Sequence, residues 1–325
     1  MPQCANGLQG MVEAHLSGAF PRSEKLVAAT RAFERGKGSQ DEVETILKQD
    51  NSSLANLQHD AALDYSVDGQ LNWQDLFRPF SELFSGIEPA SLTRWFDNNT
   101  FYRAPLVKGK INFKGDYTSK FFRADAFPTS SRKKAVLPGP FTFATLSENA
   151  ASSRRADLVD EFSHALRDLI KSLQGVGYQC FQFNEPSLCA KSRTEDDFSV
   201  AKHGIETCAK GLAGQSMLHT YFGDSSKAIE ALLDYSVDSI GVDFYATSLG
   251  SLTNVDFNKG LGCGCIDGRN SLLESPNETR DFISKARVRL EPKKIIIIPN
   301  CDLDFLPLPV AEKKVRLLGQ IKGLV

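Results

Sequence analysis

Side chains that can act as bases, nucleophiles or metal ligands follow several short apolar segments of this sequence. Glu185 ends one such segment and could act as a general base or a substrate anchor, or it could cap the following helix. Cys301 follows another segment and could supply a thiolate nucleophile or a metal ligand, although a free cysteine beside a buried strand is more often inert. His219 lies within a predicted strand, where we expect a core histidine more often than a ligand.

Two further cysteines, Cys263 and Cys265, are spaced C-x-C on one predicted strand, so both side chains face the same way. They could form half of a zinc site, or they could be two small residues that pack in the core. Asp267 and Arg269 flank Gly268 in a predicted turn. These two residues could bind an anion, or they could form a structural salt bridge with each other.

The elements that must position these residues alternate between short strands and longer helices. Several predicted strands are apolar on both faces, which is typical of a parallel sheet covered by helices. This alternation predicts an α/β fold, and eight strands favour a single (β/α)8 barrel of the TIM type over residues 1–325. The predicted strands are 11–20, 65–67, 135–137, 180–183, 217–221, 239–243, 261–266 and 295–298, and the predicted helices include 23–35, 39–63, 156–173 and 228–235.

One segment, 101–122, does not fit a strand–helix unit. We expect it to form an inserted hairpin in which strands at 105–107 and 111–113 flank a turn at 108–110. In a barrel of this type, polar residues at the carboxyl ends of the strands line the active-site mouth. The candidate residues that end strands should therefore meet at one end of the molecule.

The composition excludes several classes of protein. Hydrophobic residues make up 41% and charged residues 24% of the 325, with a net charge of −2, which is typical of a soluble globular protein. No apolar run is long enough to span a membrane, and no basic run exceeds residues 132–134, so we expect neither a membrane nor a nucleic acid as partner. Seven scattered cysteines without an export signal predict reduced thiols in a cytoplasmic protein. No glycine-rich nucleotide fingerprint follows a strand.

Four motifs, in this order along the chain, resemble cobalamin-independent methionine synthase. Residues 18–22 are similar to the family's G-x-F-P-R, 139–142 to G-P-x-T, 181–188 to Q-I-D-E-P-A-L and 298–303 to N-P-D-C-G-L. That family of zinc enzymes transfers a methyl group from a methylated folate to homocysteine and is built from two related (β/α)8 barrels. The resemblance implies the same barrel fold here and a role in methionine biosynthesis.

The family's catalytic barrel holds zinc with H-x-C, a glutamate and a cysteine. Zinc lowers the pKa of the homocysteine thiol and presents it as a thiolate. By position, this sequence has Tyr221 and Gly223 in place of H-x-C and Asp243 in place of the glutamate, and it keeps Cys301. One cysteine and one shorter carboxylate do not complete a tetrahedral site. The resemblance thus implies either no zinc or a rebuilt site in which Cys301 and Asp243 are joined by the C-x-C cysteines.

Three other stretches are similar to the family's amino-terminal, non-catalytic barrel: 220–223 to T-T-Y-F, 264–270 to G-x-I-N-G-R-N and 93–99 to T-K-W-F-x-T-N. In the family, that barrel helps to hold the polyglutamate tail of the folate with basic side chains. By position, Arg94 takes the place of one of these lysines, and Lys25 lies near the early basic group. A guanidinium suits a carboxylate, although a surface arginine that stacks on Trp95 is the alternative.

The resemblance implies substrate-binding roles for Arg22, Lys25, Arg94, Asn184 and Arg269, with Glu185 and Asp267 as strand-end candidates for catalysis. Three functions remain open. The chain could be a non-catalytic partner of a separate, zinc-bearing catalytic barrel; it could be a self-sufficient homocysteine S-methyltransferase with a rebuilt zinc site; or it could bind a folate polyglutamate or another small anion without a fixed partner.

Overall fold

Parallel strands form the central sheet of the computed structural model, which describes residues 12–115, 118–252 and 255–325. Within these residues the sheet has seven strands in the order β1-β10-β9-β8-β7-β6-β4, and every neighbouring pair is parallel. The predicted parallel α/β fold is confirmed. The strands are β1 (Val12–Ala14), β4 (Lys133–Pro138), β6 (Tyr178–Asn184), β7 (Gln215–Thr220), β8 (Ser239–Asp243), β9 (Gly260–Ile266) and β10 (Lys294–Pro299).

The segment around Ser66 spans the side of the curled sheet between β1 and β4. Its one bridge to the sheet is the parallel pair Ser66–Lys133, where Lys134 N–H donates to the Ser66 carbonyl at 2.9 Å. On the other side, Asp64 N–H donates to the carbonyl of Ala14 at 2.9 Å. The predicted strand 65–67 thus supplies the eighth barrel position, reduced to a single bridge. The predicted strand 11–20 is shorter as well, because the chain leaves the sheet after Ala14, and Met11 lies outside the described residues.

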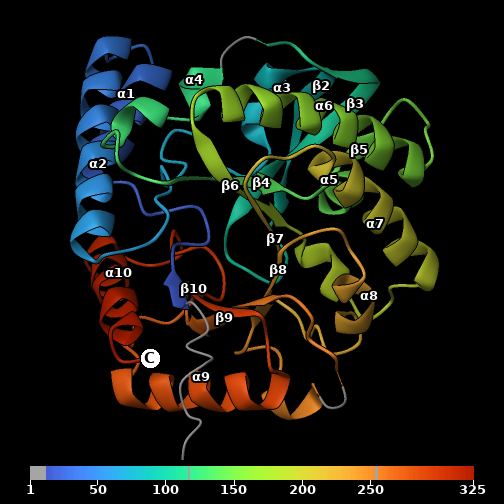
Figure 1. The fold of residues 1–325 in the computed structure, drawn as a ribbon. Helices are drawn as coiled ribbons and strands as arrows, with labels where there is room; N and C mark the ends of the chain where they lie inside the picture. Colours follow the sequence, from blue (N-terminus) through green and yellow to red (C-terminus); the bar gives the residue numbers. More distant parts are fainter. Residues whose placement is uncertain (1–11, 116–117, 253–254) are drawn as a thin grey trace, which may run out of the picture.

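Helices cover the outside of the sheet. Figure 1 shows α1, α2 and α10 together on one side and α6 and α7 on the other. The predicted hydroxyl cap at Ser39 is confirmed, since Ser39 Oγ accepts from Glu42 N–H at 3.1 Å at the start of α2. The helices are α1 (Glu24–Glu34), α2 (Gln40–Asp60), α3 (Arg78–Leu83), α4 (Thr118–Phe121), α5 (Pro140–Leu146), α6 (Arg155–Gly175), α7 (Glu195–Ala209), α8 (Ile229–Leu233), α9 (Pro276–Leu290) and α10 (Leu308–Lys322).

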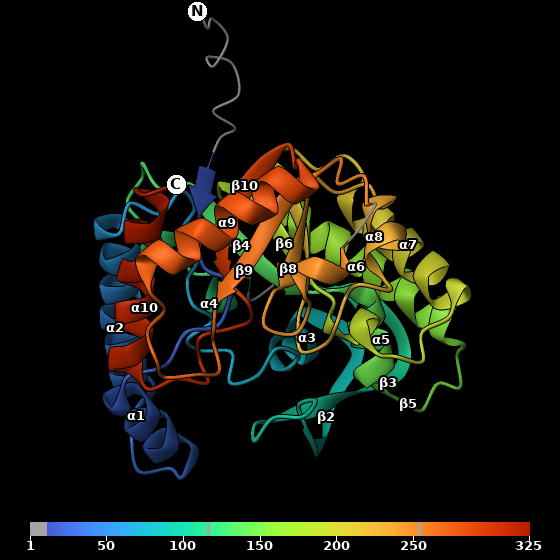
Figure 2. The same cartoon turned by 90° about the horizontal axis from the view of Figure 1, so that it is seen from below.

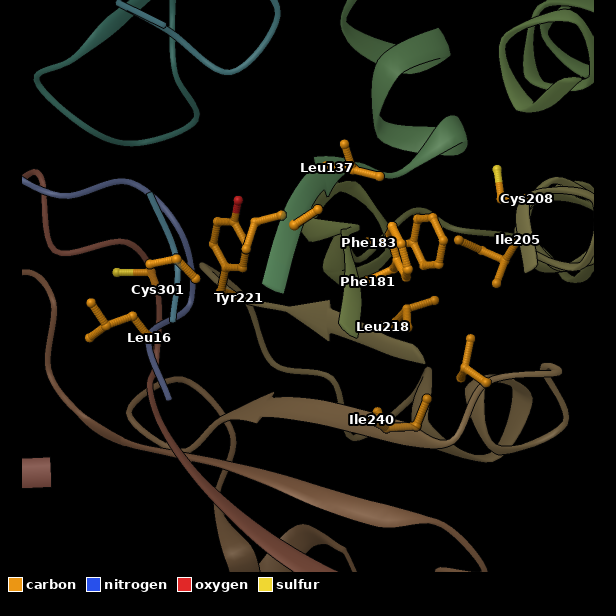
Figure 3. Packing of buried hydrophobic residues seen from close by; sticks show 14 of the residues in the cluster. Leu16, Leu137, Phe181, Phe183, Ile205, Cys208, Leu218, Tyr221, Ile240 and Cys301 are labelled. Carbon is orange, nitrogen blue, oxygen red and sulfur yellow. The ribbon is translucent and has the colours of Figure 1, made fainter. Parts of the chain in front are cut away.

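Side chains alternate between the outer layer and the barrel interior, as the two-residue period of a strand requires. Figure 3 shows Phe181, Phe183 and Leu218 on the outer side, next to Ile205 and Cys208 of α7. Inside, a small separate apolar cluster consists of Met217, Ile296 and Ile298. Polar side chains also lie inside the barrel, with His15, Lys134, Gln182 and His219 all buried.

The inserted hairpin exists, but its predicted bounds are wrong. β2 (Phe84–Arg94) pairs antiparallel with β3 (Phe101–Phe113), and the turn lies at 95–100 instead of 108–110. The predicted turn stays extended because Gly109 continues β3, while Trp95 N–H donates to the carbonyl of Thr100 at 2.9 Å to close the true turn. Pro89 lies within β2, although proline is uncommon in strands because it lacks an N–H donor. It is accommodated because β2 is an edge strand of the sheet β2-β3-β5, where β5 is Glu148–Asn149.

Candidate binding site at the barrel mouth

A cavity of about 730 Å³ opens at the carboxyl ends of β1 and β10. That volume suits a small organic ligand. Figure 2 shows α1 and the β2–β3 hairpin at the same end of the barrel, and residues of both elements line the cavity. The residues that line it are Ala19, Phe20, Pro21, Arg22, Glu24, Val27, Gln70, Trp73, Gln74, Asp75, Leu76, Trp95, Asn99, Thr100, Phe101, Tyr102, Asp302, Asp304, Phe305, Leu306, Pro307, Leu308 and Pro309.

The loops around this mouth have unusual backbone conformations. Of the described residues, Gln70 (φ 53°) and Gln74 (φ 69°) line the cavity in the left-handed region, where side chains other than glycine are strained. Phe96 (φ 48°) and Phe222 (φ 63°) share this conformation, and their rings contact each other at 5.7 Å between centroids. Residues in strained conformations persist only where the surrounding structure holds them in place, and they are found most often at functional sites.

Arg22 is the predicted binding residue that the structure places in the cavity wall. Its side chain is half-buried, and burial together with the nearby Arg31 lowers the pKa of its guanidinium. Within the described residues it makes no ion pair. Lys25 is exposed on α1 and does not line the cavity. Arg94 also lies outside, and its guanidinium stands 6.0 Å from the ring centroid of Phe101.

The other two predicted binding residues lie elsewhere. Asn184 is buried inside the barrel, where its Oδ1 accepts from Gln182 Nε2 at 2.7 Å and its Nδ2 has no partner in the described part of the chain. Arg269 is exposed, with its guanidinium 5.4 Å from the ring centroid of Phe222. The structure therefore does not bring the five predicted binding residues together in one cavity.

Glu185 caps a helix in the structure. Its two carboxylate oxygens accept from the backbone N–H groups of Phe141 at 2.9 Å and Thr142 at 2.7 Å, at the start of α5. Burial raises the pKa of this carboxyl to about 7. The arrangement corresponds to the capping alternative, but the capped helix follows the neighbouring strand β4 and not Glu185 itself. Its carboxylate has no place in the cavity wall.

Asp267 has a local role as well. Its Oδ1 accepts from the N–H of Arg269 at 2.9 Å, which fixes the turn after β9, and its own N–H donates to Glu274 at 2.7 Å. No ion pair joins Asp267 to Arg269 in the described residues. The structure therefore holds this turn with hydrogen bonds from backbone N–H groups to carboxylates, and not with the salt bridge considered from the sequence.

Asp243 joins three strand ends at the mouth. Its Oδ1 accepts from the N–H groups of Tyr245 (2.9 Å) and Ala246 (3.2 Å) and from Asn300 Nδ2 (3.1 Å), while its Oδ2 accepts from Phe222 N–H at 3.2 Å. Burial raises the pKa of this carboxyl, and the four donors oppose that shift. Both oxygens are thus already used by protein donors.

The residues present do not fit a zinc ion. Asp243 is engaged, as just described, and Cys301 Sγ donates to the Asp302 carbonyl at 3.5 Å and points away from Tyr221 in Figure 3. Burial raises the pKa of the Cys301 thiol well above its usual range, which disfavours a thiolate. Cys263 pairs with Ile297 in the sheet register and packs with Cys265 in the outer apolar layer. No group of three or more His, Cys, Asp or Glu side chains converges on a metal position in residues 12–115, 118–252 and 255–325.

The Asp243→Asn variant should lose about 2 kcal/mol of unfolding free energy. An amide keeps one acceptor oxygen but turns an NH2 group toward the Phe222 N–H, which is then a partly buried donor without an acceptor. Urea denaturation of the two proteins measures the difference. Asp224→Asn is the control, because that carboxylate bonds to Ser226 in an exposed loop. Equal stability of Asp243→Asn and the parent would contradict the role of Asp243.

Sequence reasoning did not assign a role to several residues that line the cavity. Asp302 and Asp304 follow the last strand directly, so the D-x-D spacing at 302–304 was the available signal. Three aromatic residues of the wall were missed as well. Trp73 lies in the loop that follows the segment around Ser66, and Trp95 and Tyr102 lie in the β2–β3 hairpin. Their approach to the mouth depends on the hairpin bounds, which the sequence pattern did not indicate.

Comparisons with known proteins agree with this geometry. The family model described as "Cobalamin-independent synthase, N-terminal domain" matches residues 81–290. A methionine synthase from Saccharolobus solfataricus is 25% identical over 310 residues, which cover 94% of this chain and 92% of that protein. One from Sulfolobus acidocaldarius is 25% identical over 311 residues, covering 94% and 89%. None of the described helices is long and apolar enough to cross a membrane.

Solved structures show the same fold. A B12-independent methionine synthase from Shewanella sp. W3-18-1, in complex with selenomethionine, superposes with a TM-score of 0.76 at 19% identity, covering 98% of each chain. A methyltransferase from Methanosarcina mazei reaches a TM-score of 0.64 at 13% identity, covering 98% of this chain and 95% of that one. The family model spans more than half of the sequence. The chain therefore belongs to the cobalamin-independent methionine synthase family, and its match is to the amino-terminal domain of that family.

Proposed function

We propose that this protein is a non-catalytic companion in cytoplasmic methionine biosynthesis. It would assist a separate, zinc-bearing barrel that transfers a methyl group from a methylated folate to homocysteine. The observation that carries the proposal is the state of Asp243: its carboxylate accepts four protein donors at the position where the catalytic barrel needs a zinc ligand. Neighbouring Tyr221 and Gly223 supply no imidazole or thiolate.

Apolar side chains at the mouth support a docking role. Leu92 and Phe101 are exposed on the hairpin, and Tyr245, Leu272 and Leu273 are exposed on loops after β8 and β9. Large apolar side chains gathered at one end of a molecule often mark an interaction surface. In this proposal the catalytic barrel covers that end. Arg94, which makes no ion pair in the described residues, would meet the carboxylates of the folate tail.

A reconstituted assay tests the companion role. Alone, the chain should not methylate homocysteine; added to a separately purified catalytic barrel of the family, it should raise the rate or lower the KM for the folate. Leu272→Asp should remove this gain, because Leu272 is 75% exposed at the mouth. The control is Val288→Asp, on α9, which changes a side chain with a similar exposure of 78%.

Two outcomes would overturn the proposal. The first is a mixture that behaves like the catalytic barrel alone. The second is methyl transfer by this chain alone with stoichiometric zinc that disappears in Cys301→Ser. That result would make the protein a self-sufficient methyltransferase with a rebuilt site.

A further inference from the structure

We propose that the cavity at the barrel mouth binds a small organic cation, namely an ammonium group carried on an apolar or aromatic body. Charge is the first argument. The described residues that line the cavity include four carboxylates, on Glu24, Asp75, Asp302 and Asp304, and one cation, on Arg22. A wall of this composition attracts a cation and repels a polyanion such as a folate polyglutamate tail.

Asp302 is the carboxylate best placed to receive the cation. It is 8% exposed and lines the cavity, and its Oδ1 accepts from Ala19 N–H at 3.0 Å. In the described part of the chain it has no ion pair, although a buried carboxylate is costly without one. Burial and the neighbouring Asp304 carboxylate raise the pKa of Asp302 well above its usual range. A bound ammonium would supply the missing counter-charge.

The other carboxylates have different roles. Asp75 is engaged by the protein, since it accepts from the N–H groups of Phe77 (2.9 Å), Arg78 (2.9 Å) and Arg103 (3.2 Å). Glu24 is exposed in the first turn of α1. Asp304 lies on the same loop as Asp302. The pair 302 and 304 therefore forms the anionic end of the cavity.

Aromatic rings, together with aliphatic side chains such as Val27 and Leu76, make much of the remaining wall. Trp73 is fixed by its Nε1–H, which donates to the Phe121 carbonyl at 2.8 Å, and Tyr102 OH donates to the Leu146 carbonyl at 3.1 Å. Trp95 packs edge-on against Tyr102 with 5.4 Å between centroids. Rings held in this way form a rigid, largely buried wall against which the apolar body of the ligand can pack.

The strained loop points to the same cavity. Gln70 and Gln74, both in the left-handed region, line it on either side of Trp73. Residues in such conformations persist where the surroundings over-determine them, and they gather at ligand sites. This inference does not depend on the companion role, because the observations that carry it concern the cavity wall of this chain alone.

Tryptophan fluorescence tests the proposal directly, since both tryptophans of the sequence line the cavity. Four probes of nearly one shape separate charge from shape: 2-phenylethylamine, its N-trimethyl derivative, 2-phenylethanol and 3-phenylpropanoate. We expect saturable quenching or a shift with the two cations. The alcohol and the carboxylate should bind at least about tenfold more weakly. Equal binding of all four probes, or tightest binding of the carboxylate, would overturn the proposal.

Variants locate the charge that the probe recognises. Asp302→Asn keeps the acceptor for Ala19 N–H and should weaken the amine about tenfold while it leaves the alcohol unchanged. Asp304→Asn, on the same wall, is the second variant should Asp302→Asn not fold, as judged by thermal unfolding. Asp224→Asn removes a carboxylate from a neighbouring loop outside the cavity and should bind like the parent. The assignment is wrong if the cavity variants that fold bind the amine as tightly as the parent does. It is also wrong if Asp224→Asn weakens amine binding as much as the cavity variants do.

Discussion

Gly139→Ala should destabilise the protein by about 4 kcal/mol, and removal of the Glu185 side chain should recover about half of that loss. Gly139 has φ −71° and ψ 147°, which alanine adopts without strain. The expected cost comes from contact, because a Cβ at this position would overlap Cδ, Cγ and Oε1 of Glu185. The carboxylate would have to move, and the buried N–H groups of Phe141 and Thr142 would lose their acceptor.

A double-mutant cycle measured by urea denaturation tests this coupling. Glu185→Ala alone should cost about 2 kcal/mol, since two buried donors lose their partner. The double variant should be about as stable as Glu185→Ala alone, because the obstacle to the new Cβ is gone. Gly109→Ala is the control: nothing lies within 4 Å of its added Cβ, so its effect should stay within about 0.5 kcal/mol. Additive losses in the cycle would contradict the proposed contact.

The same contact explains why a carboxylate directly after β6 misled functional reasoning. The residue type and the strand-end position of Glu185 are those of a catalytic base, and both were visible in the sequence. The direction of its side chain was not. It depends on the neighbouring strand β4, whose end Gly139 leaves room for the carboxylate against the start of α5. A side chain that reaches across a sheet is decided by tertiary packing, which single-sequence patterns do not contain.

Most of the barrel could be predicted for a simple physical reason. Strands such as Ile295–Ile298 are apolar on both faces because helices cover one side and the barrel interior lies on the other, so their pattern is continuous and easily recognised. β2 and β3 lack this pattern. They form an edge hairpin with a half-exposed face, and Gly109 and Pro89 within them resemble turn residues. The hairpin was therefore predicted in kind but not in its bounds.

The hairpin error also hid the cavity. Its walls come from the segments 19–27, 70–76, 95–102 and 302–309, which are far apart in the sequence and meet because the hairpin lies at the mouth. The basic residues singled out from the family motifs lie, apart from Arg22, outside this cavity. The strand ends in the sequence predicted at which end of the barrel the site lies. The negative charge of the cavity wall could not be predicted, because it comes from loops far apart in the sequence whose contact no local pattern indicates.

The interior of the barrel contains a buried lysine without a counter-charge among the described residues. Lys134 is 1% exposed, and its ammonium donates to His15 Nδ1 at 2.8 Å and to the Leu16 carbonyl at 2.7 Å. It makes no ion pair in the described residues, and burial lowers its pKa from 10.5 to about 8. Burial and the same ammonium lower the pKa of His15 well below 6.5, which keeps the imidazole a neutral acceptor.

Lys134→Met should remove a pH dependence of stability at alkaline pH. Between pH 8 and 10.5 the unfolded chain binds a proton at this lysine that the folded protein does not, so the free energy of unfolding of the parent should rise with pH. Relative to Lys134→Met, the parent should gain about 3 kcal/mol across this window, a difference that urea denaturation at several pH values measures. Lys133→Met is the matched control, since it removes the adjacent lysine, whose ammonium donates to the Val176 carbonyl and is not enclosed by the barrel. If the free energy of unfolding depends on pH in the same way in the parent and in Lys134→Met, the pKa of Lys134 is not lowered in the folded protein. The same conclusion follows if Lys133→Met changes the pH dependence as much as Lys134→Met does.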